Sequence, residues 1–168
     1  MASKTVLMTG VSGFVGIQTL LCFTSAGYFV RGAVRSQKSA AQVHTAANKL
    51  GISGLKYELV IVPDITAPGA FDSYLDGVDG IIHVASPFYN GAKNFDDVYL
   101  PAVHGTLGIL KSAAKRTDGR IKRVVVTSSF AAVCDFSKGP RPGYVYTEKD
   151  WNPITKEQAL KVKPLQYV

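Results

Sequence analysis

Short, wholly apolar runs alternate along this chain with longer stretches whose apolar residues recur at helical spacing. A strand that is buried on both faces is apolar throughout, so such runs indicate a parallel sheet covered on both sides. The runs predict five strands, over Thr5–Met8, Tyr28–Val34, Lys56–Val62, Asp79–Val84 and Ile121–Thr127.

The stretches between these runs predict the helices that connect parallel strands. The predicted helices are Phe14–Ala26 with Gly27 as its stop, Gln37–Leu50, Pro68–Leu75 and Phe95–Lys115. Alternation of this kind is typical of the α/β class, and we expect a doubly wound parallel sheet of Rossmann type with right-handed crossovers. Beyond Ser129 the pattern weakens: 137–143 has the turn residues of a surface loop, and 156–163 is compatible with the start of another helix.

The most informative segment lies between the first predicted strand and the first predicted helix. It reads Thr9-Gly10-Val11-Ser12-Gly13-Phe14-Val15-Gly16. In a dinucleotide-binding turn the first glycine allows the tight bend, the second lets the backbone approach the pyrophosphate, and the third lets the helix pack close to the strand. The free N–H groups at the helix start attract the anion. A plain strand-to-helix turn is the alternative, whereas a P-loop is excluded because no Gly-Lys-Ser/Thr follows.

The residue after the second strand bears on which cofactor is bound. Sites for NAD commonly carry an acidic residue here for the ribose hydroxyls, but this chain has Arg35, with Lys38 three residues on. Arg35 can bind a 2′-phosphate bidentately, and Lys38 is a weaker candidate for the same group. The pattern favours NADP, with an ordinary exposed arginine as the alternative. Arg31, inside the strand, is expected to be structural.

Two further strand ends face the same edge of the predicted sheet. After the third strand, Asp64 can accept a hydrogen bond from the adenine amino group and Ile65 can pack on the ring, although a turn aspartate explains Asp64 equally well. After the fourth strand, the small residues Ala85, Ser86 and Pro87 let the backbone approach the nicotinamide.

Composition and charge exclude several classes of protein. The chain has 168 residues, 46% of them hydrophobic, which is enough for one soluble domain, and no apolar run reaches the ~18 residues that span a bilayer. The net charge of +7 suits a cofactor with several phosphate charges. A nucleic-acid surface is not favoured, because the basic residues between 111 and 123 have no interleaved aromatic residues or nucleic-acid motif.

Cysteine and histidine usage points to an intracellular protein without a metal. Cys22 and Cys134 are isolated and form no disulfide framework, and no signal peptide precedes the first strand, so we expect a cytoplasmic protein. Cys22 is predicted to be a small core residue. The histidines are far apart and lack an acid or cysteine cluster, so no metal site is expected, and His83 is interpreted as a hydrogen-bonded core residue.

Several short motifs occur in an order that resembles one known family. They are Thr9–Gly16, Val34-Arg35-Ser36, Pro63-Asp64-Ile65, His83–Phe88, Pro101-Ala102-Val103, Val125–Ser129 and Trp151-Asn152-Pro153. Together they resemble the extended short-chain dehydrogenase/reductases, most closely the NADPH-dependent methylglyoxal and aldehyde reductases related to dihydroflavonol reductases. The resemblance covers essentially the whole chain. It implies NADPH as cofactor and a small carbonyl compound as substrate.

The resemblance also implies a catalytic site. The family uses a serine, a tyrosine and a lysine four residues after the tyrosine, on one face of a helix, where the ammonium lowers the tyrosine pKa and the tyrosine gives its proton to the carbonyl oxygen. By resemblance Ser129 takes the serine role and Tyr167 the tyrosine role, and the lysine falls beyond Val168. The Tyr-x-x-x-Lys at 89–93 is interpreted as a decoy, because it precedes the serine and contains a glycine.

The family fold includes later strands and a smaller substrate domain, so the resemblance implies that residues 1–168 are the NAD(P)-binding, N-terminal part of a longer reductase, inactive alone. Phe88, Tyr89, Phe130 and Phe136 are candidates for an apolar substrate pocket, with core or loop packing as the alternative. Two other functions stay open: a non-catalytic NADP-binding module, and epimerisation or dehydration of a nucleotide sugar. Arg35 counts against the latter, because those enzymes usually retain NAD.

Overall fold

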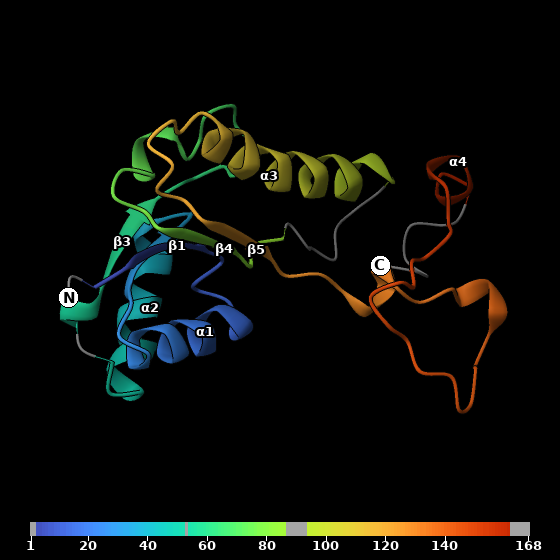
Figure 1. Ribbon diagram of the computed structural model, residues 1–168, viewed down its shortest axis with the longest axis horizontal. Helices are drawn as coiled ribbons and strands as arrows, with labels where there is room; N and C mark the ends of the chain where they lie inside the picture. Colours follow the sequence, from blue (N-terminus) through green and yellow to red (C-terminus); the bar gives the residue numbers. More distant parts are fainter. Residues whose placement is uncertain (1–2, 53, 87–93, 162–168) are drawn as a thin grey trace. The chain divides into compact units, whose positions relative to one another are not determined.

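The computed structural model describes residues 3–52, 54–86 and 94–161 of the chain. These residues form one parallel sheet, in the strand order β3-β2-β1-β4-β5 (Figure 1). The strands are β1 (Thr5–Thr9), β2 (Phe29–Val34), β3 (Tyr57–Ile61), β4 (Gly80–His83) and β5 (Arg123–Val126). The sheet confirms the predicted fold class. The chain order reverses between β1 and β4, and ligands of doubly wound sheets bind at such a switch point.

The helices differ from the predicted ones mainly in length. They are α1 (Phe14–Ser25), α2 (Gln37–Lys49), α3 (Asp96–Ala114) and α4 (Lys156–Ala159). The predicted helix over 68–75 is wrong, since only a 3₁₀ turn over Asp72–Tyr74 forms there. Gly69 has a φ of +72°, a left-handed conformation that no α-helix contains, so a helix cannot run on from Pro68.

Two apolar clusters lie on opposite faces of the sheet. Val6 and Met8 belong to the cluster under α1 and α2, whereas Leu7, between them in β1, belongs with Phe71 and Ile109 to the cluster on the α3 face. Successive side chains of a strand point to opposite faces, which is why a continuous apolar run is needed to fill both clusters. The sheet thereby holds the carboxyl ends of β1, β2 and β4 in fixed register.

The interpretation of Cys22 as a core residue is wrong. The buried stripe of α1 consists of Gly16, Leu20 and Thr24, which are four residues apart, and Cys22 lies two residues from its nearest members, on the exposed side of the helix. Cys134 is buried, and both cysteines are free. Within the described ranges, no helix is long and apolar enough to cross a membrane.

The chain divides into two compact units. The first comprises Met1–Pro87 and Leu100–Thr127 and contains the sheet; the second comprises Phe88–Tyr99 and Ser128–Val168. In the second unit Asn152 ties distant segments together, donating from its backbone N–H to the carbonyl oxygen of Ala132 at 2.8 Å and from Nδ2 to that of Ala131 at 3.0 Å. A capping box at Thr155 and Gln158 starts α4.

Candidate functional site

The turn after β1 brings two strand ends into direct backbone contact. Gly10 has a φ of +70°, in the left-handed region that favours glycine. A Cβ placed on Gly10 would lie 2.6 Å from the backbone nitrogen of Ala85, which follows β4. Glycine is therefore required at position 10 both for the bend and for the approach of the β4 end.

The start of α1 packs tightly against this turn. The backbone N–H of Gly13 donates to the carbonyl oxygen of Gly10 at 3.0 Å. A Cβ on Gly16 would lie only 2.0 Å from that same oxygen, so no larger residue fits at position 16. Val11 is fully buried, and its side chain packs against Gly32 of β2, which fixes the turn to the sheet.

The N-terminal end of α1 is open to an anion. Its N-cap residue Gly13 provides no side-chain hydrogen bond, and the first turn contains no acidic residue. By contrast, Ser36 caps α2 by accepting a hydrogen bond from the backbone N–H of Ser39. Ser12 and Gly13 are exposed, and Phe14 and Val15 are 88% and 52% exposed. The uncapped N–H groups and the helix dipole together favour a phosphate at this point.

Arg31 and Arg35, both on or beside β2, have different environments. Arg31 Nε lies 2.5 Å from Glu58 Oε1, and its Nη1 donates to the carbonyl oxygens of Tyr74 and Asp76 at 2.8 Å, which is the structural role predicted for it. Arg35 follows the last residue of β2, is exposed, and has no hydrogen-bond or ion-pair partner in the described part of the chain. Lys38, in the first turn of α2, is also exposed.

Thr9 and His83 form a buried polar link between β1 and β4. Thr9 Oγ1 lies 2.8 Å from His83 Nδ1 and accepts hydrogen bonds from the backbone N–H groups of Val84 and Ala85 at 3.2 and 3.1 Å. Because the oxygen already accepts twice, its own proton is donated to Nδ1, and the imidazole is neutral with its proton on Nε2. Burial lowers the pKa of His83, which also favours this neutral form. The interpretation of His83 as a hydrogen-bonded core residue is confirmed.

The segment after β3 forms a tight turn. Asp64 Oδ1 accepts from both the Oγ1 hydroxyl and the backbone N–H of Thr66, each at 2.7 Å, and these bonds lower the pKa of the carboxyl group. Ile65 packs against α3, where a Cβ on Gly105 would lie 3.0 Å from its Cδ1. Asp64 therefore has the turn-stabilising role that the sequence offered as an alternative. A contact of Asp64 and Ile65 with adenine stays a prediction.

Ser129, in the second unit, begins a 3₁₀ turn. Its Oγ accepts from the backbone N–H of Ala131 at 3.2 Å, which leaves the hydroxyl proton available to another acceptor. Next to it, the ring of Phe130 meets Phe136 and Tyr146 edge-on, at centroid distances of 6.2 and 5.8 Å. Ser86 is exposed, whereas Pro87, Phe88, Tyr89 and Tyr167 lie outside the described residues.

Sequence reasoning missed two contributors to these sites. The sequence presents Thr9 only as the first position of the glycine motif, and its hydrogen bond to His83 arises because parallel pairing of β1 and β4 puts the two residues opposite each other. The guanidinium of Arg141 stacks 3.2 Å from the ring centroid of Tyr144 and lies 5.7 Å from that of Tyr146. The thiol of Cys134 lies 3.4 Å from the hydroxyl oxygen of Tyr146, and this contact raises the pKa of Tyr146. No local pattern marks this second group, because its four residues meet only after the loop folds.

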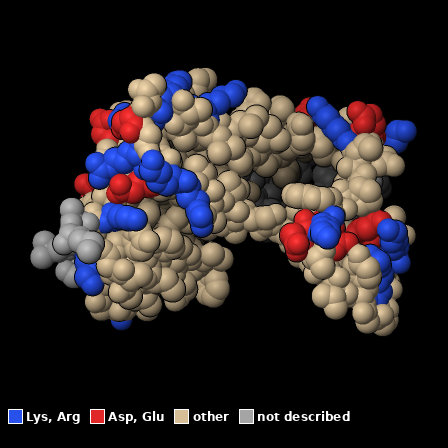
Figure 2. All heavy atoms as spheres, in the orientation of Figure 1, with Lys and Arg blue, Asp and Glu red and all other residues tan. Residues whose placement is uncertain are grey.

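Three of the six basic residues between 111 and 123, namely Lys115, Arg116 and Arg120, pair with acids. Lys115 binds Asp72 at 2.6 Å, and Arg116 bridges Asp76 and Asp118 at 2.5 and 2.7 Å. Figure 2 shows basic and acidic side chains interleaved on this part of the surface. A cluster of three or more histidine, cysteine, aspartate or glutamate side chains that would hold a metal ion is absent from the residues that the structure describes.

A parallel sheet with a glycine turn at its switch point and an uncapped helix start is a dinucleotide-binding domain in its architecture. Residues 6–156 match the model of the NAD dependent epimerase/dehydratase family, and the chain belongs to that family.

Several similar proteins are reductases or oxidoreductases by name, and others are named NAD-dependent epimerase/dehydratases. A putative uncharacterised oxidoreductase of Schizosaccharomyces pombe is 48% identical over 162 residues, covering 95% of this chain and 47% of the relative. A putative NADPH-dependent methylglyoxal reductase of Candida albicans is 39% identical over 173 residues, covering 99% and 50%. The crystal structure of yeast methylglyoxal/isovaleraldehyde reductase Gre2 with NADPH superimposes with a TM-score of 0.82 at 32% identity, covering 95% of this chain and 47% of Gre2. The chain spans about half the length of these relatives.

Proposed function

We propose that residues 1–168 form the NADPH-binding, N-terminal part of a longer reductase that converts an aldehyde or ketone to an alcohol. One observation carries the proposal: the turn from Gly10 to Gly16 opens onto an uncapped helix start, and Arg35, an exposed cation with no ion-pair partner among the described residues, stands at the end of the adjacent strand. The relatives named as NADPH-dependent reductases support the same assignment.

Each phosphate of NADPH has a matching group in the first unit. The amide of Ser12, the free N–H groups in the first turn of α1 and the helix dipole receive the pyrophosphate, because no side-chain cap or acidic residue competes for them. Arg35 binds the 2′-phosphate through its planar guanidinium, with Lys38 as a second cation. Asp64 and Ile65 hold the adenine end, and the small residues Ala85, Ser86 and Pro87 leave room for the nicotinamide end.

The reaction is carried by two residues assigned from the family resemblance. When bound, NADPH supplies the hydride that forms the new C–H bond at the carbonyl carbon. Ser129 donates its free hydroxyl proton in a hydrogen bond to the carbonyl oxygen, and Tyr167 transfers its phenolic proton to that oxygen as the C=O electron pair moves onto it. The products would be the alcohol, oxidised NADP⁺ and a tyrosinate, whose charge a lysine beyond Val168 stabilises. The aromatic cluster at Phe130 and Phe136 forms an apolar wall for the substrate.

Thermal unfolding of the chain with NADPH and with NADH tests the cofactor assignment. We expect NADPH at a hundred times its dissociation constant to stabilise the fold by about 2.7 kcal/mol, and NADH to stabilise it less. Arg35→Gln removes the preference for NADPH, whereas the control Lys149→Gln, which removes an exposed cation in the second unit, keeps it. Equal stabilisation of the unmodified chain by both cofactors contradicts the role of Arg35.

Activity of the full-length protein tests the reaction. We expect oxidation of NADPH with methylglyoxal or another small aldehyde, and its loss in Ser129→Ala. Retention of tightly bound NAD together with turnover of a nucleotide sugar would instead assign the protein to the epimerase branch of its family.

A further inference from the structure

The motif Trp151-Asn152-Pro153 has no role in the cofactor turn or in the proton transfer, yet its middle residue contacts the turn that follows Ser129. The backbone N–H of Asn152 donates to the carbonyl oxygen of Ala132 at 2.8 Å, and its Nδ2 donates to that of Ala131 at 3.0 Å. The motif is thereby bound to a segment that lies 21 residues earlier in the chain, directly after the proposed catalytic serine.

The side chain of Asn152 is held in one orientation. Its Oδ1 accepts a hydrogen bond from the backbone N–H of Ile154 at 3.0 Å, while its Nδ2 donates to Ala131. Exchanging the two amide atoms would set oxygen against oxygen and N–H against N–H. Pro153 restricts Asn152 further, because the residue before a proline is confined to extended backbone. The position therefore suits an amide, which donates and accepts, and does not suit a carboxylate, which only accepts.

One peptide group links Asn152 to Ser129. Its carbonyl oxygen, from Ala131, accepts from Asn152 Nδ2, and its N–H, from Ala132, donates to the carbonyl oxygen of Ser129 at 2.9 Å. The N–H of Ala131 donates to Ser129 Oγ at 3.2 Å. The backbone and the hydroxyl of Ser129 are thus both bound by the two residues that Asn152 holds.

The turn after Ser129 depends on contacts from outside it. Phe130–Ala132 is a 3₁₀ turn of three residues, and a turn this short closes too few hydrogen bonds to be stable alone. Ser129 is exposed, so water competes for the N–H group that orients its hydroxyl. Precise placement matters for the reaction, because a shift of about 1 Å in a catalytic group can cost about a hundredfold in rate.

We propose that Asn152 is a positioning residue for the reduction: through the peptide group between Ala131 and Ala132 it holds the Ser129 hydroxyl where that hydroxyl donates to the carbonyl oxygen of the substrate. The inference rests on the proposed function, which gives Ser129 this role. Asn152 acts through the turn and needs no contact of its own with substrate or cofactor. Because the hydrogen bond from Ser129 strengthens as charge develops on the oxygen, poor positioning lowers kcat and leaves KM nearly unchanged.

Asn152→Asp is the sharpest variant, since a carboxylate keeps the shape and the acceptor for Ile154 but lacks the donor for Ala131. NMR relaxation of the full-length protein measures the positioning without activity. We expect the order parameters of the Ala131 and Ala132 amides to fall from near the rigid value of about 0.85 towards the flexible value of about 0.6. The amides of β1 are expected to stay rigid.

Kinetics of the full-length protein measures the consequence for the reaction. Ser129→Ala is expected to lower kcat about a hundredfold, because it removes a donor to the developing oxyanion. Asn152→Asp is expected to lower kcat about tenfold, with the KM for NADPH unchanged. In the Ser129→Ala background the change at Asn152 costs nothing further, since no hydroxyl is left to position. A merely structural role would cost the same factor in both backgrounds.

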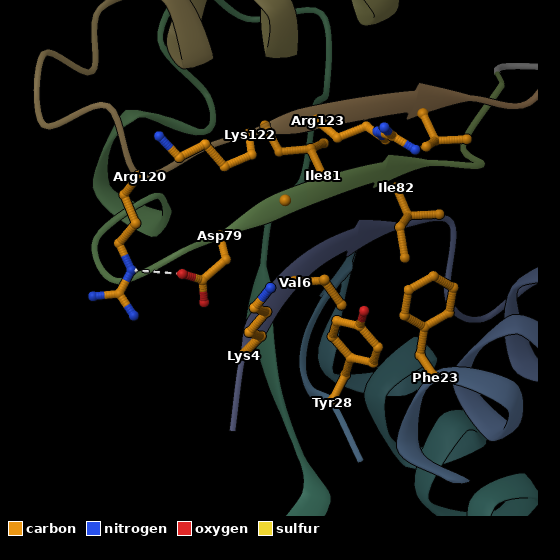
Figure 3. Close-up of a pocket in the computed structure, with 12 residues that line it drawn as sticks. Lys4, Val6, Phe23, Tyr28, Asp79, Ile81, Ile82, Arg120, Lys122 and Arg123 are labelled. Atoms are coloured by element: carbon orange, nitrogen blue, oxygen red, sulfur yellow. Dashed lines mark hydrogen bonds and ion pairs between the residues drawn. The ribbon is translucent and has the colours of Figure 1, made fainter. Parts of the chain in front are cut away.

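Two control variants lower the net charge by the same amount as Asn152→Asp. Asn48→Asp alters an exposed asparagine of α2, and Lys122→Gln removes an exposed cation that lines a hollow in the first unit (Figure 3). Both are expected to keep kcat, the KM for NADPH and the order parameters at Ala131 and Ala132. Circular dichroism of each variant establishes that the fold is kept.

Three results overturn the proposal: unchanged order parameters at Ala131 and Ala132 in Asn152→Asp, an unchanged kcat in that variant, or an equal loss of kcat with and without the Ser129 hydroxyl. Failure of the proposed function has a different signature, since the unmodified enzyme then reduces no aldehyde or ketone, or Ser129→Ala keeps full activity. The order parameters still decide in that case whether Asn152 holds the serine.

Discussion

Thr9 Oγ1 lies 2.8 Å from His83 Nδ1, and this contact joins the carboxyl ends of β1 and β4 at the switch point of the sheet. The same oxygen accepts the backbone N–H groups of Val84 and Ala85, directly beneath the position where Gly10 and Ala85 touch. One hydroxyl therefore satisfies three groups at the base of the proposed cofactor site, and the geometry of the glycine turn depends on it.

Replacing this hydroxyl tests that dependence. Thr9→Val keeps the shape of the side chain but leaves two N–H groups and His83 Nδ1 without their partner, so we expect a loss of about 1–3 kcal/mol in the free energy of unfolding. Urea denaturation measures the loss. Thr9→Ser retains the hydroxyl and is expected to stay much closer to the unmodified chain. A valine variant as stable as the serine variant would contradict the role assigned to Oγ1.

His83 makes stability depend on pH in a defined direction. Burial lowers the folded-state pKa of His83 below its ordinary value of 6.5, so the unfolded chain binds more protons just below that pH. The contribution is fully present above pH 6.5 and is lost as the pH falls towards the folded-state value. We expect the free energy of unfolding to fall between about pH 7 and pH 5.5, above the range in which carboxylates titrate.

Two histidine variants separate His83 from the remaining titratable groups. His83→Gln is expected to flatten the stability profile between about pH 7 and pH 5.5, because it removes the group that titrates there. His104→Gln, which changes an exposed histidine of α3, is the matched control. An equal slope in His83→Gln and the unmodified chain would show that His83 is not the responsible group.

Gly10 and Gly77 offer a matched pair for testing the backbone contact at the glycine turn. Both have a left-handed backbone, with φ of +70° and +74°, so alanine costs each about 1–2 kcal/mol in conformation. At Gly77 nothing lies within 4 Å of an added Cβ, whereas at Gly10 the Ala85 backbone nitrogen lies at 2.6 Å. We expect Gly10→Ala to lose a further ~1–3 kcal/mol through overpacking and to lose NADPH binding. Urea denaturation measures the loss in the free energy of unfolding. Equal losses in the two variants would mean that the backbone at Ala85 moves to make room for the added Cβ without destabilising the fold.

The predictable parts of the molecule are those in which burial dictates residue type. The β1 run from Thr5 to Met8 must fill two clusters at once, so its apolar pattern identifies the strand and its parallel neighbours without further information. The glycine turn was predictable for the same reason, since its spacing reflects contacts that leave no room for a Cβ. The exposure of Cys22 was not predictable, because the continuous apolar run Leu20–Phe23 hides which side of α1 faces the sheet.

The candidate site was only partly predictable. Arg35 could be named from its position after a strand, because the edge of the sheet fixes where that side chain begins. The second unit gave no such guide: Ser129 was assigned through family resemblance, and the contacts of Arg141 arise between residues of an irregular loop.

Arg141 provides the last prediction, which concerns order in this loop. Its guanidinium stacks on Tyr144, and Tyr146 in turn meets the ring of Phe130, which follows Ser129. Arg141→Ala removes the cation from the stack, so we expect faster proteolysis between 137 and 147 and weaker near-ultraviolet circular dichroism from the tyrosines. Arg141→Lys keeps the charge but not the planar stacking, so we expect its cleavage rate and its circular dichroism to lie between those of the unmodified chain and those of Arg141→Ala. Lys149→Ala, which removes an exposed cation close by, serves as the control. Unchanged cleavage and dichroism in Arg141→Ala would show that the aromatic cluster orders the loop without the arginine.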